Sequence, residues 1–401
     1  MAFVLRIFLL LCVTTYVSAQ SQFDFFYKAL SANENKYPDS AFYYIDKSLS
    51  FEWDSVIALQ RAKWDAAAGN YQKALDEVVE VIEKGNINAT LYAARYYAFM
   101  GEIEKSLSNL NTYIHCPGSL PHNIIRTDSS FSAFTDLPSW ESFWLTAKSD
   151  ELMELRADIS YRLIQKDYNS LFDVIDNALL KYPDASELHY YRFLVFYYTE
   201  NYSGALKSIN KAMKLLPDNA EYYYVRAGLY KKTKSYSKAI KEYQKYRDLY
   251  PYNIYVLKEM TQTAMDAENA DAAIQYAEEF LVYFHNDINL LFTYALALEM
   301  KKEYRMAIEN YTKVLYLDRD HADSYYRRGM CYFELGEFEK ATNEFTLTMD
   351  LRPRNGEVFY YRGLARLNNG DKIGACRDFE RAKIYGNFNA DGYLMKLCNE
   401  K

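Results

Sequence analysis

Apolar and polar residues follow one another with a fixed period over more than half of this chain. From residue 152 to residue 389 the pattern recurs every 34 residues, and seven units follow one another without a gap. A period of this length is typical of a solenoid of helical hairpins. The position that shows it best is the twentieth of each unit, which is small in six of seven: Leu171, Ala205, Ala239, Ala273, Ala307, Ala341 and Ala375.

Two further positions recur with the same period. The seventeenth residue is aromatic in five units, and the thirty-second is proline in four: Tyr168, Tyr202, Tyr236, Tyr304, Phe338; Pro183, Pro217, Pro251, Pro353. The array resembles the tetratricopeptide repeat, whose unit is a helix-turn-helix hairpin. The resemblance implies an all-α fold, a right-handed α-solenoid of stacked repeats with one interrupting segment.

A looser form of the pattern precedes this array, over residues 20–115. Tyr71-Gln-Lys-Ala74 and Ile103-Glu-Lys-Ser106 each have the sequence expected at the start of a second helix, and their small residues are 32 positions apart. Residues 23–49 have helical spacing on both sides of Tyr37-Pro-Asp. We therefore predict about three units here, the first of them degenerate, as terminal repeats often are.

Residues 116–151 break the period. They open with Cys116-Pro-Gly-Ser-Leu-Pro, which stops a helix, and continue with aromatic residues at helical spacing, chiefly Phe131, Phe134, Trp140 and Trp144. Two interpretations are open. The rings form an exposed interface for a partner, a membrane surface or self-association, or they plug the end of the N-terminal array.

In the resembled family, one face of the first helix of each unit lines a concave groove that holds ligands. Here this face is rich in aromatic and basic residues: Tyr190, Tyr197, Tyr224, Lys231, Lys258, Phe292, Tyr326, Phe333 and Tyr360. Rigid amphipathic rings give contact area at low entropic cost. We expect a peptide or protein-segment site on this face. The alternatives are that the rings only stabilise the helices, or that they bind a small ligand or glycan.

Arginine recurs at the seventh position of four units, as Arg192, Arg226, Arg328 and Arg362. A row of cations could recognise an acidic ligand. The other interpretation is structural, because each arginine could pair with a neighbouring acid or stack on a ring.

Composition and the N-terminus suggest the compartment. The formal charge is -7 over 401 residues, and this acidity argues against nucleic acid, whose binders have basic patches. Residues 1–19 have one arginine, an apolar run from Ile7 to Val13 and the small residues Ser18 and Ala19, as in a cleaved secretory signal. The run is too short to span a bilayer. We expect an exported protein that is periplasmic, at the cell surface or secreted, perhaps in an envelope or secretion assembly.

Four cysteines follow the predicted signal, as Cys116, Cys331, Cys376 and Cys398. The C-terminal stretch resembles that of exported bacterial tetratricopeptide proteins, and this resemblance implies a Cys376–Cys398 disulfide that pins a capping helix over residues 390–401. Cys116 and the histidines beside it lack the paired spacing of zinc ligands, and the chain has no catalytic or phosphate-binding motif. We expect a scaffold without enzymatic activity, metal or cofactor.

Overall fold

The computed structural model of this protein describes residues 22–116, 119–120, 122–147 and 151–398. Over these ranges every regular element is a helix, and none of the helices is long and apolar enough to cross a membrane. The predicted signal peptide at residues 1–19 lies outside the described residues. The all-α architecture predicted from the period is confirmed.

The chain forms two compact units. One contains the residues up to Thr233 together with Gln244–Asn253, and the other contains Lys234–Tyr243 together with Ile254–Lys401. Helix α14 (Tyr236–Leu249) therefore contributes residues to both units. The boundaries that the repeat pattern suggested, at residues 20–115, 116–151 and 152–389, stay predictions.

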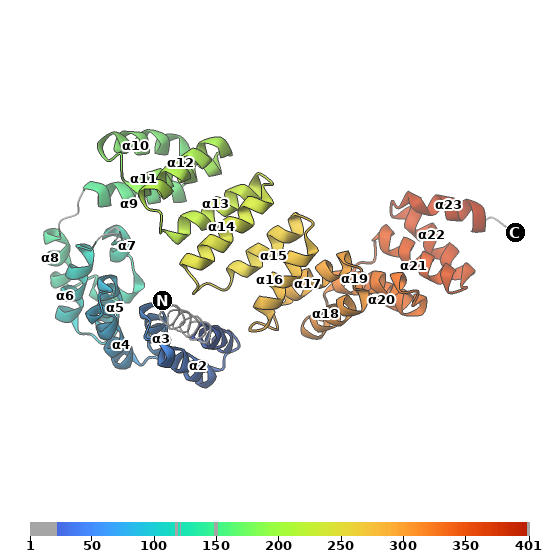
Figure 1. The fold of residues 1–401 in the computed structure, drawn as a ribbon, viewed down its shortest axis with the longest axis horizontal. Helices are drawn as coiled ribbons and strands as arrows, with labels where there is room; N and C mark the ends of the chain where they lie inside the picture. Colours follow the sequence, from blue (N-terminus) through green and yellow to red (C-terminus); the bar gives the residue numbers. More distant parts are fainter. Residues whose placement is uncertain (1–21, 117–118, 121, 148–150, 399–401) are drawn as a thin grey trace, which may run out of the picture. The chain divides into compact units, whose positions relative to one another are not determined.

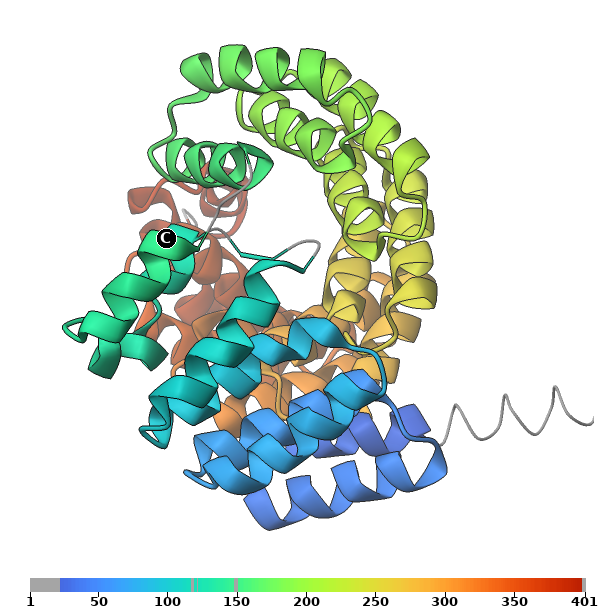
Figure 2. The same ribbon diagram turned by 90° about the vertical axis from the view of Figure 1, so that its left-hand side faces the viewer.

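The first unit begins with a helix over residues 22–34. Its further helices are α2 (Pro38–Phe51), α3 (Ser55–Ala67), α4 (Tyr71–Glu83), η1 (Ile87–Ala89), α5 (Thr90–Phe99), α6 (Ile103–Ile114), α7 (His122–Arg126), η2 (Ser129–Phe134), α8 (Pro138–Thr146), α9 (Glu151–Ile164), α10 (Tyr168–Lys181), α11 (Ser186–Tyr198), α12 (Tyr202–Leu215) and α13 (Ala220–Lys232). Long helices pair with their neighbours in the chain, as α11 does with α12 (Figures 1 and 2).

The second unit continues the same design. Its helices are α15 (Val256–Asp266), α16 (Ala270–Leu281), α17 (Ile288–Met300), α18 (Tyr304–Leu317), α19 (Ala322–Glu334), α20 (Phe338–Leu351), α21 (Gly356–Asn368), α22 (Lys372–Ile384), η3 (Phe388–Ala390), α23 (Asp391–Tyr393) and η4 (Leu394–Cys398). Each long helix from α15 to α22 packs on the next one in the chain. The last segment, which the sequence predicted as one capping helix, consists of three short helical pieces.

The turn inside each hairpin uses one residue in the left-handed conformation. In ten hairpins this residue lies two positions before the second helix, and six of the ten are lysine or glutamate: Lys36, Gly69, Gly101, Lys166, Glu200, Lys234, Glu268, Lys302, Gly336 and Gly370. The conformation lets the turn donate to the last carbonyls of the first helix; the Asp167 N–H, for example, donates to the Arg162 carbonyl at 3.0 Å. The side chain gives no hint of this role, because charged residues and glycine share it.

The hairpins close around the small residues of the period. The side chains at position 20 are fully buried in all seven units, from Leu171 to Ala375. In the last unit a Cβ added to Gly363 would lie 2.7 Å from a ring carbon of Phe379, so the two helices of this hairpin meet at a position that only glycine fits. Phe379 and its counterparts Phe345 and Tyr311 are themselves fully buried.

Replacing Ala307 by leucine tests this packing. Ala307 is fully buried in α18, so the larger side chain should overpack the crossing and lower the free energy of unfolding by about 1–3 kcal/mol. The thermal midpoint measures the effect, and the matched control is Glu309→Leu on the exposed face of the same helix. Equal midpoints for the Ala307→Leu variant and the wild type would contradict the packing described here.

Candidate functional site

In the first unit, the predicted site tyrosines are used for packing between repeats. The Tyr190 ring stacks on Tyr222 of the next hairpin with centroids 5.5 Å apart, and burial raises the pKa of Tyr190 to about 12. Tyr197 lies 5.7 Å from the Phe193 ring, and Tyr224 lies 5.2 Å from the Tyr246 ring. These three rings therefore stabilise the array. Lys231, also predicted for the site, lies in the last turn of α13.

In the second unit, two more of the predicted residues are engaged between hairpins. The Lys258 ammonium is 2.6 Å from Asp287, the residue that caps the N-terminus of α17. The Phe292 ring lies 5.6 Å from Tyr311 and 5.0 Å from the ring of His321. The structural interpretation accounts for Lys258 and Phe292 as it does for the tyrosines of the first unit.

The remaining predicted residues, Tyr326, Phe333 and Tyr360, come together on two consecutive first helices, α19 and α21. With three aliphatic side chains they form a set of partly buried residues packed on one core cluster. We call this set the α19–α21 face: Tyr326, Met330, Phe333, Tyr360, Leu364 and Leu367. Each helix contributes its residues at four- and three-residue spacing, which keeps them on one side of the helix.

Hydrogen bonding holds the rings of this face in place. The Tyr326 hydroxyl donates to Glu357 at 2.9 Å across the two helices, and burial together with this carboxylate raises the pKa of Tyr326. Burial also raises the pKa of Tyr360. Both hydroxyls therefore stay protonated at neutral pH and remain available as polar groups beside apolar ring faces.

The recurring arginines are structural. Arg328 donates to Glu344 of its own hairpin at 2.9 Å and to Thr312 of the preceding hairpin, also at 2.9 Å. Arg362 pairs in the same way with Asp378 at 2.6 Å and with Thr346 at 3.1 Å. Arg192 pairs with Asp176 at 3.0 Å, and Arg226 donates to Asn210 at 2.8 Å.

Each of these arginines also lies over an aromatic ring, as Arg328 does over Tyr325 at 5.7 Å. Position 7 therefore ties neighbouring second helices together through a first helix. The interpretation that the arginines recognise an acidic ligand has no support in this geometry, because their guanidinium groups already have partners.

The aromatic residues of the interrupting segment are core residues. Phe131 and Phe134 are at most 2% exposed, and Trp140 and Trp144 at most 9%. They form one cluster with Leu110 and other apolar residues of α5 and α6. The expectation that these rings form an exposed interface is therefore wrong. They cover apolar side chains of the preceding hairpin, which the next hairpin would cover in an unbroken array.

A contact that the period does not predict joins distant parts of the first unit. The Tyr252 hydroxyl donates to Asp54 at 2.6 Å, and the Tyr27 hydroxyl donates to the carbonyl of Pro251 at 2.5 Å. The Phe23 ring lies 5.5 Å from Tyr252. We call these residues the N-terminal clasp. The paired residues are about 200 positions apart, and no sequence signal links them.

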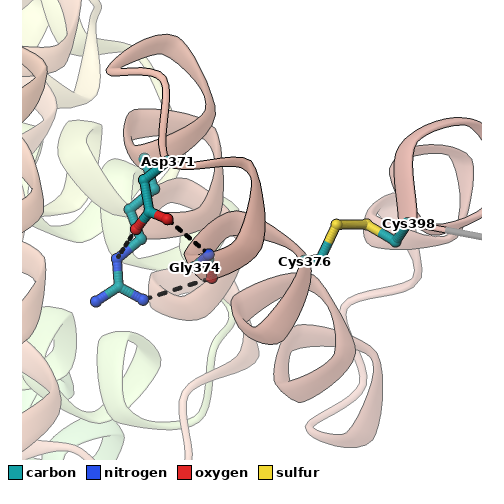
Figure 3. Close-up of a disulfide and its surroundings, with 5 residues drawn as sticks. Asp371, Gly374, Cys376 and Cys398 are labelled. Atoms are coloured by element: carbon teal, nitrogen blue, oxygen red, sulfur yellow. Dashed lines mark hydrogen bonds and ion pairs between the residues drawn. A yellow bond between two sulfur atoms is a disulfide. The ribbon is translucent and has the colours of Figure 1, made fainter. Parts of the chain in front are cut away.

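The predicted disulfide is present. Cys376 of α22 and Cys398 at the end of η4 are bonded, with Cα atoms 5.7 Å apart (Figure 3). The start of α22 is fixed by Asp371, whose carboxylate accepts from the Gly374 N–H at 2.8 Å (Figure 3). Cys116 and Cys331 are free thiols. In the described parts of the chain, no group of three or more histidine, cysteine, aspartate or glutamate side chains is placed to hold a metal ion.

Family models match two stretches of this chain. Both models describe the tetratricopeptide repeat; one matches residues 190–254, and the other matches residues 288–321 and 322–355. The resemblance inferred from the period is thereby confirmed for the repeats.

Solved structures show the same architecture. The C-terminal part of a TPR repeat-containing protein from Cytophaga hutchinsonii is 18% identical, with a TM-score of 0.53, and the match covers 60% of this chain and 99% of that one. A tetratricopeptide repeat protein from Parabacteroides merdae is 19% identical, with a TM-score of 0.43 over 61% of this chain and 97% of that one. MamA is 27% identical, with a TM-score of 0.38 over 41% and 96%.

The N-terminal clasp can be tested with Tyr252→Phe. This change removes the hydroxyl that donates to Asp54, and losing a hydrogen bond to a charged group should lower the free energy of unfolding by about 1.5–3 kcal/mol. Chemical denaturation measures the effect. Tyr198→Phe makes the same chemical change at a ring that is 55% exposed, and it should leave stability unchanged. Equal losses in the two variants would contradict a stabilising clasp.

Proposed function

This chain is a tetratricopeptide repeat protein, and from that premise we propose that it is an interaction scaffold whose α19–α21 face holds a segment of a partner protein. One observation carries the proposal. Tyr326, Phe333 and Tyr360 keep part of their surface exposed side by side with Met330, Leu364 and Leu367, whereas the other predicted site residues are engaged in contacts between hairpins. Partly exposed rings on a rigid support are the anchors that protein interfaces favour.

The charges beside the face indicate what the segment carries. Glu334 and Glu357 are exposed on α19 and α21, and the only basic residue within α19 on the same side, Arg327, already lies 3.1 Å from Glu299. A segment with apolar anchors and flanking basic residues therefore complements the face. Charges at such a rim act mainly on the rate and specificity of association.

A photocrosslinking experiment tests this proposal. p-Benzoylphenylalanine in place of Phe333 should capture a partner protein, whereas the same group in place of Tyr316, which is 83% exposed on α18, should not. Met330→Gln with Leu367→Gln should abolish the capture, because amides remove the apolar contact at nearly constant size. Capture that is equal at both positions, or that survives the double substitution, would contradict the assignment of the face.

We further propose that the protein is exported and works in an envelope or secretion assembly. The predicted signal at residues 1–19 supports export, and so does the Cys376–Cys398 disulfide, because such bonds persist in oxidising compartments and are rare in the cytosol. The bond closes a loop of 22 residues, which by chain entropy corresponds to about 3 kcal/mol of stabilisation.

Cell fractionation with non-reducing mass spectrometry tests export. Protein that starts at Gln20 and carries the 376–398 linkage should be found in the exported fraction. Reduction of this protein should lower its thermal midpoint, and a Cys376→Ser, Cys398→Ser variant should show the lowered midpoint without reductant. A full-length chain with free thiols at both positions, found in the cytosol, would overturn the proposal.

A further inference from the structure

The second unit contains a hollow of about 740 Å³ at its C-terminal end. Glu357, Tyr360 and Tyr361 of α21 line one side, and the turn after α22 lines the other side with Tyr385, Asn387 and Phe388. This volume lies within the range of about 300–1,000 Å³ that is usual for small-molecule sites. The hollow belongs to the last repeat and the turn that follows it, so its ligand is short compared with the array.

The hollow arises because the array ends without a complete further hairpin. One unit earlier, Tyr326 donates to Glu357 of the next first helix at 2.9 Å. The residue 34 positions after Glu357 is Asp391, but its carboxylate pairs with Lys383 at 2.8 Å. Tyr360, the counterpart of Tyr326, is instead neighboured by the Tyr393 ring at 6.1 Å. Short helical pieces thus stand where a full first helix would fill the space.

The backbone around the hollow is closely fitted. A Cβ added to Gly356 would lie 2.7 Å from the Tyr385 carbonyl oxygen and 2.9 Å from that of Ala382, so the start of α21 contacts the end of α22 directly. Gly386 has a φ of 86°, which turns the chain from α22 into η3. These two glycines fix the wall that carries Tyr385 and Phe388.

The polar lining is neutral and fixed in orientation. Asn355 accepts from the Glu357 N–H at 3.0 Å, and Asn387 accepts from the Asn389 N–H at 3.1 Å. An amide that accepts in this way still has two N–H donors. Arg354 and Glu357 contribute one charge of each sign. The lining therefore suits an uncharged ligand that both donates and accepts hydrogen bonds.

Aromatic surface lies beside these polar groups. The Phe388 side chain is 69% exposed, and Tyr385 is 41% exposed while it stacks on Phe359 with centroids 5.5 Å apart. Water hydrates a bare phenylalanine ring poorly, so a ligand with an apolar face would gain by covering it. A sugar ring has such a face, formed by its C–H groups, and carries hydroxyl groups around its edge.

We infer that this hollow binds a neutral saccharide, with Phe388 under the sugar ring and the asparagine amides on its hydroxyls. A peptide segment fits less well, because peptide sites need pockets for successive side chains and this hollow spans one repeat. The inference is independent of the proposed function, although Tyr360 belongs both to the hollow and to the α19–α21 face.

Calorimetric titration of the full chain, with its disulfide intact, tests the inference. The probes are maltotriose, cellotriose and chitotriose, together with the neutral peptide Gly-Asn-Gly. At least one trisaccharide should bind with a Kd of about 1 mM or tighter. Phe388→Ala should weaken this binding by about tenfold or more, which corresponds to 1.4 kcal/mol.

The matched control is Ile384→Ala. Ile384 is 74% exposed near the same end of the array but does not line the hollow, so its loss should leave the Kd within about twofold of the wild type. Because Phe388 is also largely exposed, both variants should fold, and their thermal midpoints verify this. Crosslinking from position 333 should persist in Phe388→Ala, which separates this site from the proposed protein site.

Three results would overturn the inference. The first is that no trisaccharide binds at the concentrations used. The second is that binding is equally strong in Phe388→Ala, or equally weakened in Ile384→Ala. The third is that the peptide alone binds and depends on Phe388, which would make the hollow a peptide site.

Discussion

The structure depends on the close crossing of two short helices inside each repeat. One hairpin buries too little apolar surface to be stable alone, so each relies on its neighbours. The small residue at position 20 is fully buried in every unit of the second array, and at Gly363 the approach leaves no room even for a methyl group. Every other feature of the array, including its surfaces, follows from how the large side chains arrange themselves around these crossings.

The many aromatic and charged residues divide into two groups under this constraint. Most tyrosines and all four recurring arginines are used between hairpins, as the Tyr190–Tyr222 stack and the Arg328–Glu344 pair show. These contacts add directional restraints to apolar packing, because a buried charge must find its partner. Only near the end of the array, on α19 and α21 and in the turn after α22, do rings keep surface for another molecule.

Three devices handle the places where the repeat stops. The interrupting segment covers apolar side chains of α5 and α6 with its own rings. The N-terminal clasp joins Tyr252 to Asp54. The disulfide holds the short closing pieces of the chain against α22. A stack of hairpins leaves an apolar surface wherever it ends, and each device shields such a surface or ties down its edge.

The sequence by itself determined the repeat, the helical class and the core positions, because a period of 34 residues reports local geometry that recurs in each unit. It also identified position 7 as special and, by resemblance, paired Cys376 with Cys398. It could not decide which exposed-looking rings are free, because Tyr190 and Tyr360 occupy equivalent positions and differ only in what the next hairpin brings to them. The tertiary structure alone decided this, as it decided the burial of Phe131 and Trp140, the clasp between Tyr252 and Asp54, and the hollow beside Phe388. Each depends on a residue far along the chain or on an incomplete neighbour, and a periodic pattern carries no information about either.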